Sequence, residues 1–134
     1  MASFATLQVA GQALAAQSLR LNTVASNMAN ADAVSGDPNA VYQPRHPVFQ
    51  TVLTESGAVG VAVSEIQTET AAPQQRYMPG HPDADEKGYV YAPNVDIVEA
   101  MADMLSAARS YQSSLELMNT SKDLLLRTLE TGRG

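Results

Sequence analysis

The fold of this chain is decided by the stretch FATLQVAGQALAAQSLRLNTVASNM, which occupies residues 4–28. Residues spaced alternately three and four apart define one side of a predicted helix: Phe4, Leu7, Gly11, Leu14, Ser18, Leu21, Ala25 and Met28. This spacing is the a/d stripe of a heptad repeat, and it predicts a long helix that packs against another helix. Because large residues alternate with small ones after Phe4, a neighbouring backbone can approach closely.

The remaining surface of this predicted helix is almost uncharged. Residues 1–31 contain a single charged residue, Arg20, among Ala, Gln, Ser, Thr and Asn. A surface helix of a soluble monomer normally has a charged outer face. We therefore expect this helix to be covered on several sides.

The C-terminal part of the chain repeats the pattern over a longer stretch. Its stripe has the same alternating spacing and is interrupted only by Lys122: Ile97, Met101, Met104, Ala108, Tyr111, Leu115, Met118, Lys122, Leu125 and Leu129. Asn94 or Asp96 can cap the start of this helix, and Gly132 is a plausible stop. Further apolar residues widen the surface beyond one seam, so we expect more than one packing partner: Val98, Leu105, Leu117, Leu124 and Leu126.

All seven prolines lie between Pro38 and Pro93, so the two ends are free to be long helices. Residues 48–53 and 59–66 are predicted to be strands with a turn at 55–57, and 89–91 is a possible third strand. Residues 71–88 are predicted to be loop. We therefore expect a discontinuous helical assembly domain, residues 1–33 and 94–134, and a central β-hairpin and loop segment, residues 34–93.

The predicted fold is mainly α with a small β region, and it is elongated. Helices of about 30 and 36 residues are roughly 45 and 54 Å long. A globular chain of this size has a radius of gyration of only about 14 Å. Two such helices, paired in coiled-coil fashion, would be buried only by joining other copies or partners.

Composition excludes several classes of function. The 134 residues include 8 Lys+Arg against 14 Asp+Glu, a net charge of −6, with no cluster of cations. A nucleic-acid partner is therefore not expected, because phosphate contacts need clustered Lys and Arg. The chain has no cysteine, which removes thiolate catalysis and Cys-based metal sites. We expect no cofactor and no small-molecule substrate.

The acidic loop at residues 83–88 resembles a calcium-binding loop only in part. Asp83, Asp85 and Gly88 fit positions 1, 3 and 6 of the EF-hand loop. Lys87 occupies position 5, which needs an oxygen ligand, and Asn94 occupies position 12, which needs a bidentate Glu. We therefore interpret the segment as a solvated turn and expect no metal and no catalytic residues.

Two other classes of protein stay open as alternatives. One is a soluble helical adaptor or chaperone that binds partner helices. The other is a small hydrolase that uses His46, His81 and the acidic loop.

Two asparagines, Asn27 and Asn30, lie three residues apart near the end of the first predicted helix. Asn competes for backbone hydrogen bonds and is a mediocre helix former. On an apolar surface the pair indicates either buried polar anchoring between chains or a frayed last turn that uses Asn as a stop. The spacing does not separate these two interpretations.

These same residues carry a resemblance to a known family. The run LNTVASNMANA at residues 21–31 resembles the N-terminal signature of the flagellar axial proteins of bacteria, which form the rod and hook. Four further stretches resemble the proximal rod proteins of that family: YMPGHPDADEKGYV at 77–90 followed by PNVD at 93–96, AARSYQ at 107–112, LMNTSK at 117–122, and YQPRHPVF at 42–49. The resemblance covers the whole chain.

The resemblance implies a structural subunit of the flagellar basal-body rod, without enzymatic activity. Family members stack helically with their terminal helices inward and form a hollow drive shaft across the periplasm. The implied partners are copies of the chain itself, other rod proteins and the flagellar type III export apparatus. We expect the assembly interface to comprise the two stripes, without Phe4 and Lys122, together with Asn27 and Asn30.

Overall fold

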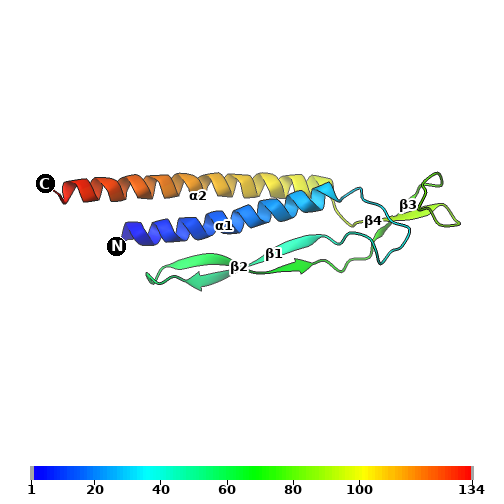
Figure 1. The fold of residues 1–134 in the computed structure, drawn as a ribbon, viewed down its shortest axis with the longest axis horizontal. Helices are drawn as coiled ribbons and strands as arrows, with labels where there is room; N and C mark the ends of the chain where they lie inside the picture. The colour runs from blue at the N-terminus through cyan, green and yellow to red at the C-terminus, as the bar shows by residue number, and fades with distance from the viewer. Residues whose placement is uncertain (1, 134) are drawn as a thin grey trace.

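The computed structural model describes residues 2–133, and its longest elements are two helices that lie side by side (Figure 1). Helix α1 spans Ala2–Ala29 and helix α2 spans Ile97–Thr131. They run antiparallel, so the start of α1 and the end of α2 lie at the same end of an elongated molecule. The prediction of two long terminal helices in contact is confirmed.

Local hydrogen bonds define where α2 begins and ends. The Asp96 carboxylate accepts from the backbone N–H of Val98 at 2.9 Å and of Glu99 at 3.2 Å. This is the N-cap arrangement, which satisfies amides that lack a partner in the first turn. At the other end, the N–H of Gly132 donates to the Thr128 carbonyl at 3.0 Å. Of the two possible caps in the sequence, Asp96 is the one used.

Strands β1, Arg45–Leu53, and β2, Val59–Thr68, form an antiparallel hairpin that runs along α1 (Figure 1). The predicted strands are confirmed and are longer than expected. Gly57 in the turn has φ +78°, a conformation that favours glycine. Gly60 is buried against α1, where an added Cβ would overlap the side-chain amide of Gln12. The hairpin therefore approaches the helix closely because position 60 has no side chain.

The prediction that residues 71–88 form only loop is wrong for four of them. Strand β3, Gln74–Tyr77, pairs antiparallel with β4, Tyr89–Ala92. The sequence QQRY has neither apolar alternation nor β-branched residues, so its strand conformation depends on its partner. Residue Ser35 also forms an isolated bridge with Tyr91, which ties the segment after α1 to β4.

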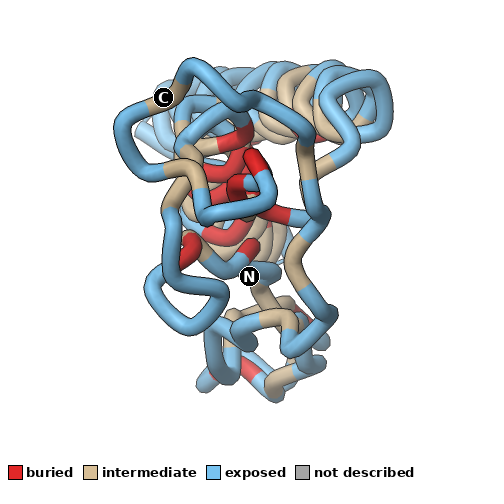
Figure 2. The backbone as a smooth tube through the Cα atoms, turned by 90° about the vertical axis from the view of Figure 1, so that its right-hand side faces the viewer, coloured by how far each residue is buried: buried red, intermediate tan, exposed pale blue. Residues whose placement is uncertain are grey.

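The core of the described residues is thin and consists mostly of small side chains. In the end-on view of Figure 2 most buried positions lie in the middle of the molecule, and a few lie in the hairpin below it. The buried apolar residues are Ala10, Ala16, Val24, Ala31, Val41, Val90, Ala92 and Ala107. Small residues let helices and strands come close, but each contributes little buried apolar area. Many larger apolar side chains stay exposed on the same fold.

Candidate assembly interface

The face of α2 that is least exposed has heptad spacing, but it differs from the predicted stripe at every second position. Its members are Met104, Ala107, Tyr111, Ser114, Met118, Ser121 and Leu125. The large residues coincide with the predicted stripe, whereas the small residues each precede a predicted member by one position. Short side chains at these positions permit close packing of α2 on α1. As a result, Leu115 and Lys122 lie exposed.

Helix α1 lies between α2 and the β1–β2 hairpin, and this position explains its lack of charge (Figure 1). Its own chain covers it on two sides. Arg20, the one charged residue of the segment, is partly buried and forms an ion pair with Asp103 of α2. The expected covering of α1 is therefore provided in part by the chain's own hairpin.

One side of α1 stays exposed and consists of small residues. We call it the α1 outer stripe; its spacing alternates between three and four, and its members are Ala15, Ser18, Asn22, Ala25 and Ala29. Ser18 and Ala25 are members of the predicted interface. The other predicted α1 positions are half-buried, apart from Asn27, which is buried: Leu7, Gly11, Leu14, Leu21, Met28 and Asn30.

A second exposed surface lies on α2 and consists of large apolar residues. We call it the α2 outer ridge; its members are Ile97, Met101, Leu105 and Leu115, with exposed fractions of 39%, 56%, 56% and 37%. All but Leu105 belong to the predicted interface. Ala108 is half-buried, and Leu129 is exposed near the end of the helix. Exposed apolar surface of this extent is typical of a binding face.

Asn27 makes its hydrogen bonds within the chain. Its Oδ1 atom accepts from the Tyr42 hydroxyl at 2.8 Å and from the Arg45 N–H at 3.0 Å. Its Nδ2 atom donates to the Arg45 carbonyl at 2.8 Å. Asn30, just after the helix, donates to the Ser26 carbonyl at 2.8 Å. Asn27 thus anchors the start of β1 to α1, a role that neither interpretation of the sequence included.

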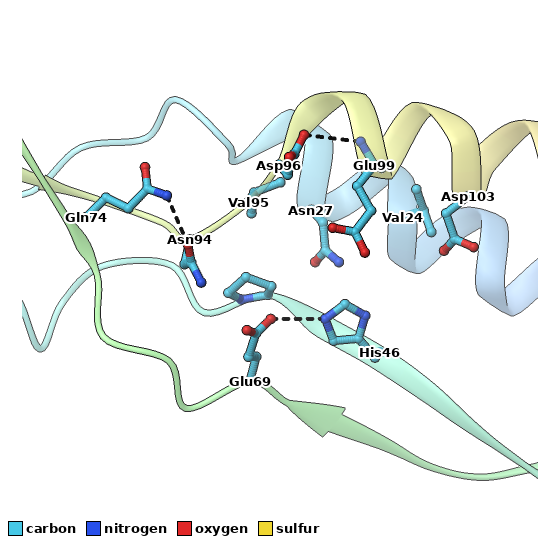
Figure 3. Close-up of a pocket in the computed structure, with 12 residues that line it drawn as sticks. Val24, Asn27, His46, Glu69, Gln74, Asn94, Val95, Asp96, Glu99 and Asp103 are labelled. Atoms are coloured by element: carbon cyan, nitrogen blue, oxygen red, sulfur yellow. Dashed lines mark hydrogen bonds and ion pairs between the residues drawn. The ribbon is translucent and has the colours of Figure 1, made fainter.

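A cleft of about 540 Å³ lies where the end of α1, the base of the β1–β2 hairpin and the start of α2 meet (Figure 3). The carboxylates of Glu69, Asp96, Glu99 and Asp103 contribute to its lining. His46 Nε2 lies 3.2 Å from Glu69 Oε2, and both side chains are more than a third exposed. The cleft is therefore polar, open and predominantly acidic.

The structure does not bring the two histidines into one site. His81 lies in the loop between β3 and β4, outside the cleft that His46 lines. Its Nδ1 atom accepts from the Asp83 N–H at 3.1 Å, a local turn contact. Within residues 2–133, no three His, Asp or Glu side chains are grouped as a metal site would require. The hydrolase alternative therefore has no assembled set of residues.

Neither α1 nor α2, nor any other helix in the described range, has the length and apolarity needed to cross a membrane.

Comparison with known proteins decides the family. The chain is 45% identical over 134 residues to the flagellar basal-body rod protein FlgC of Salmonella typhimurium strain LT2, a match that covers 99% of this chain and 100% of the relative. The chain belongs to the FlgC family of flagellar basal-body rod proteins. FlgC of Bacillus subtilis strain 168 is 33% identical over 150 residues, covering 99% and 100%. FlgC of Aquifex aeolicus is 38% identical over 129 residues, covering 95% of each chain.

Two family models match the parts of the chain that hold the helices. Residues 7–36 match the model of the flagella basal body rod protein, and residues 86–131 match the model of the flagellar basal body rod FlgEFG protein C-terminal region. Like other FlgC proteins, the chain is a structural subunit of the flagellar basal-body rod and not an enzyme. Membership of the rod family implies assembly with other rod subunits.

Proposed function

We propose that the chain polymerises helically through α1 and α2, as a subunit of the proximal part of the rod, and that the resulting hollow shaft transmits torque across the periplasm. The assembly domain comprises residues 1–33 and 94–134, of which residues 1 and 134 lie outside the described part. Within the central segment, 34–93, the β1–β2 hairpin covers one side of α1. The main support for this proposal is that a chain of the FlgC family leaves two complementary surfaces exposed, the α1 outer stripe and the α2 outer ridge.

The α1 outer stripe and the α2 outer ridge differ in size in the way that packed helices require. Small side chains on one helix leave grooves into which large side chains of another helix fit. Because the two surfaces differ, a contact between them is heterologous, and heterologous contacts build open helical assemblies when they do not close into rings. Neighbours in such an assembly are copies of this chain and other rod proteins.

The energy available from this contact is sufficient for assembly when contacts repeat. Fully burying one Leu, Ile or Met side chain stabilises by about 1.5–3 kcal/mol. The four ridge residues are already half covered, so burying the remainder contributes roughly 3–5 kcal/mol per contact. Torque is then shared by many contacts in parallel. In this proposal the flagellar type III export apparatus delivers the chain to the growing rod.

The experiment uses the bacterium that encodes the chain. Met101→Asp combined with Leu105→Asp places two charges on the exposed ridge without touching buried positions. We expect cells with this variant to be non-motile and their basal bodies to lack the rod, as in a strain with the gene deleted. Ser113→Asp, at an exposed position on another side of α2, is the matched control and should preserve swimming.

Helix content by circular dichroism separates a failure of assembly from a failure of folding. Complete rods in cells that express only the ridge variant would show that the ridge is not the interface. Complete rods in the deletion strain would refute the proposed function itself.

A further inference from the structure

The two-stranded sheet of β3 and β4 projects beyond the helix pair, at the end of the molecule where α1 ends and α2 begins (Figure 1). The helix contacts of the proposed function leave this sheet without a role. Cross-strand neighbours in an antiparallel pair lie on the same face, and successive residues alternate between the faces. The pairs Arg76–Val90 and Tyr77–Tyr89 therefore lie on opposite faces of the sheet.

The two faces of this sheet differ in burial. Val90 and Ala92 are completely buried, so their face packs on the rest of the chain. On the opposite face, Tyr77 and Tyr89 are 65% and 37% exposed, and Gln75 beside them is also exposed. We call this exposed side the tyrosine face; its members are Gln75, Tyr77, Tyr89 and the half-buried Tyr91.

The tyrosines of this face are held in a fixed arrangement. The rings of Tyr77 and Tyr89 contact each other edge to face, with their centroids 5.3 Å apart and their planes at 60°. Gly88 has φ +83° and lies against the Tyr77 ring, where no space remains for a Cβ. A side chain that is ordered before binding loses little entropy in a contact, and Tyr is enriched among the residues that dominate protein interfaces.

The segment that follows α1 runs beside this sheet. Ser35 forms a bridge with Tyr91 of β4, and Gly36 lies against the Asp83 carbonyl in the loop between β3 and β4. Residues 32–37 and the β3–β4 hairpin therefore form one unit at this end of the molecule.

This unit carries a surplus of negative charge beside the tyrosine face. Its charged residues are five carboxylates and two cations: Asp32, Asp37, Asp83, Asp85 and Glu86, with Arg76 and Lys87. The Arg76 guanidinium is already engaged by the Asp32 carboxylate at 3.2 Å. The exposed Glu86 has no ion-pair partner among residues 2–133. An ordered aromatic face next to unpaired carboxylates fits a partner that brings cations.

Charge also decides which class of partner this surface fits. Anionic lipids and nucleic acids carry phosphates, which the surplus carboxylates repel. A second copy of the chain has no cluster of cations to offer, because the four cations of residues 104–133 alternate along the sequence with three carboxylates. The partner that fits is therefore a different protein with a basic surface.

We propose that the tyrosine face binds a basic surface of a different protein of the basal body. An arginine of that partner stacks on the exposed ring of Tyr77, and neighbouring cations lie against Glu86 and the other surplus carboxylates. A guanidinium suits both parts, because its plane stacks on aromatic rings and its N–H groups bind carboxylates. The contact goes beyond the proposed function, since it uses no residue of α1 or α2.

Photo-cross-linking in the bacterium that encodes the chain tests this contact. The photoreactive residue p-benzoylphenylalanine replaces Gln75, which is exposed on the tyrosine face. Met78, which directly follows β3 and is 41% exposed, is the second probe position, for the case in which the first variant does not assemble. Basal bodies from irradiated cells should contain the chain linked to a different protein, and the linked peptide of that partner should contain Arg or Lys.

Substitutions beside the probe measure what the carboxylates and the ring contribute. Glu86→Lys should lower the cross-linked fraction roughly fivefold, equivalent to about 1 kcal/mol. Glu55→Lys is the matched control and should leave the fraction unchanged, since Glu55 is an exposed carboxylate in the distant turn between β1 and β2. Tyr77→Ala should also lower the fraction, whereas Tyr77→Phe keeps the ring and should retain it.

The other outcomes overturn the inference. A product that contains two copies of this chain would show that the face joins like subunits. Equal cross-linked fractions for Glu86→Lys and Glu55→Lys would show that charge does not select the partner. Complete rods without a product from either probe position would show that the face is unoccupied, and they would leave the proposed function intact.

Discussion

Replacing Asn27 by Ala tests the anchor between α1 and the start of β1. The side chain is only 5% exposed and makes three hydrogen bonds, two to the Arg45 backbone and one to the Tyr42 hydroxyl. A buried hydrogen bond contributes about 0.5–1.5 kcal/mol net, so three contribute roughly 3 kcal/mol. Because Arg45 is exposed, water can form some of the hydrogen bonds that its backbone loses when the Asn27 side chain is removed. We therefore expect Asn27→Ala to lower the free energy of unfolding by about 2 kcal/mol.

Urea unfolding of the purified chain, followed by circular dichroism, measures this loss. Hydrogen exchange should show faster exchange at the Arg45 amide, whose acceptor is removed. Asn22→Ala is the control. Because Asn22 is exposed on the same helix, this substitution changes stability only through helix propensity. Asn27→Asp keeps the acceptor but places a carboxylate oxygen against the Arg45 carbonyl at a buried position, so it should destabilise at least as much as Asn27→Ala. If Asn27→Ala and Asn22→Ala unfolded at the same urea concentration, the anchor would have no energetic role.

Three further predictions concern the packing of the chain. A double-mutant cycle of Arg20→Ala and Asp103→Ala should give a coupling energy of about 1 kcal/mol from urea midpoints, reduced in high salt, since the pair is only partly buried; zero coupling would contradict it. Gly88→Ala should destabilise by about 1–2 kcal/mol more than Gly57→Ala, because both have positive φ but only position 88 lacks space for a Cβ; equal unfolding midpoints would disprove this. Gln17→Met should raise the urea midpoint by an amount equivalent to about 1 kcal/mol, since the Gln17 Oε1 atom is buried and no group among residues 2–133 hydrogen-bonds to it; an unchanged or lower midpoint would contradict this.

The elements with periodic apolar residues could be predicted from the sequence. Strands β1 and β2 contain runs of β-branched and other apolar residues on either side of a turn with Gly57, and both helices show heptad spacing. Strand β3 could not be predicted, because QQRY has no β-branched residue and its conformation follows from pairing with β4. Periodicity is a local signal, whereas strand pairing is a contact between segments distant in sequence.

The candidate site was predictable only in part, for a related reason. Heptad spacing located the apolar side of α2, but it did not show that Ala107 and Ser121 would be buried in place of Ala108 and Lys122. That choice depends on how closely α1 approaches. Likewise, the lack of charge on α1 predicted that other segments cover this helix, but it did not identify the β1–β2 hairpin as one of them.

The antiparallel helix pair has a practical consequence for anyone who wishes to label this subunit. The start of α1 and the end of α2 lie at the same extremity, so an affinity peptide or fluorescent reporter fused at either place would crowd that end of the helix pair. Gly80, in the exposed turn between β3 and β4 at the opposite extremity, has open space beside its Cα. A small epitope inserted there would report on the subunit while leaving both helices unaltered; because the tyrosine face adjoins this turn, the label would also compete with the proposed partner.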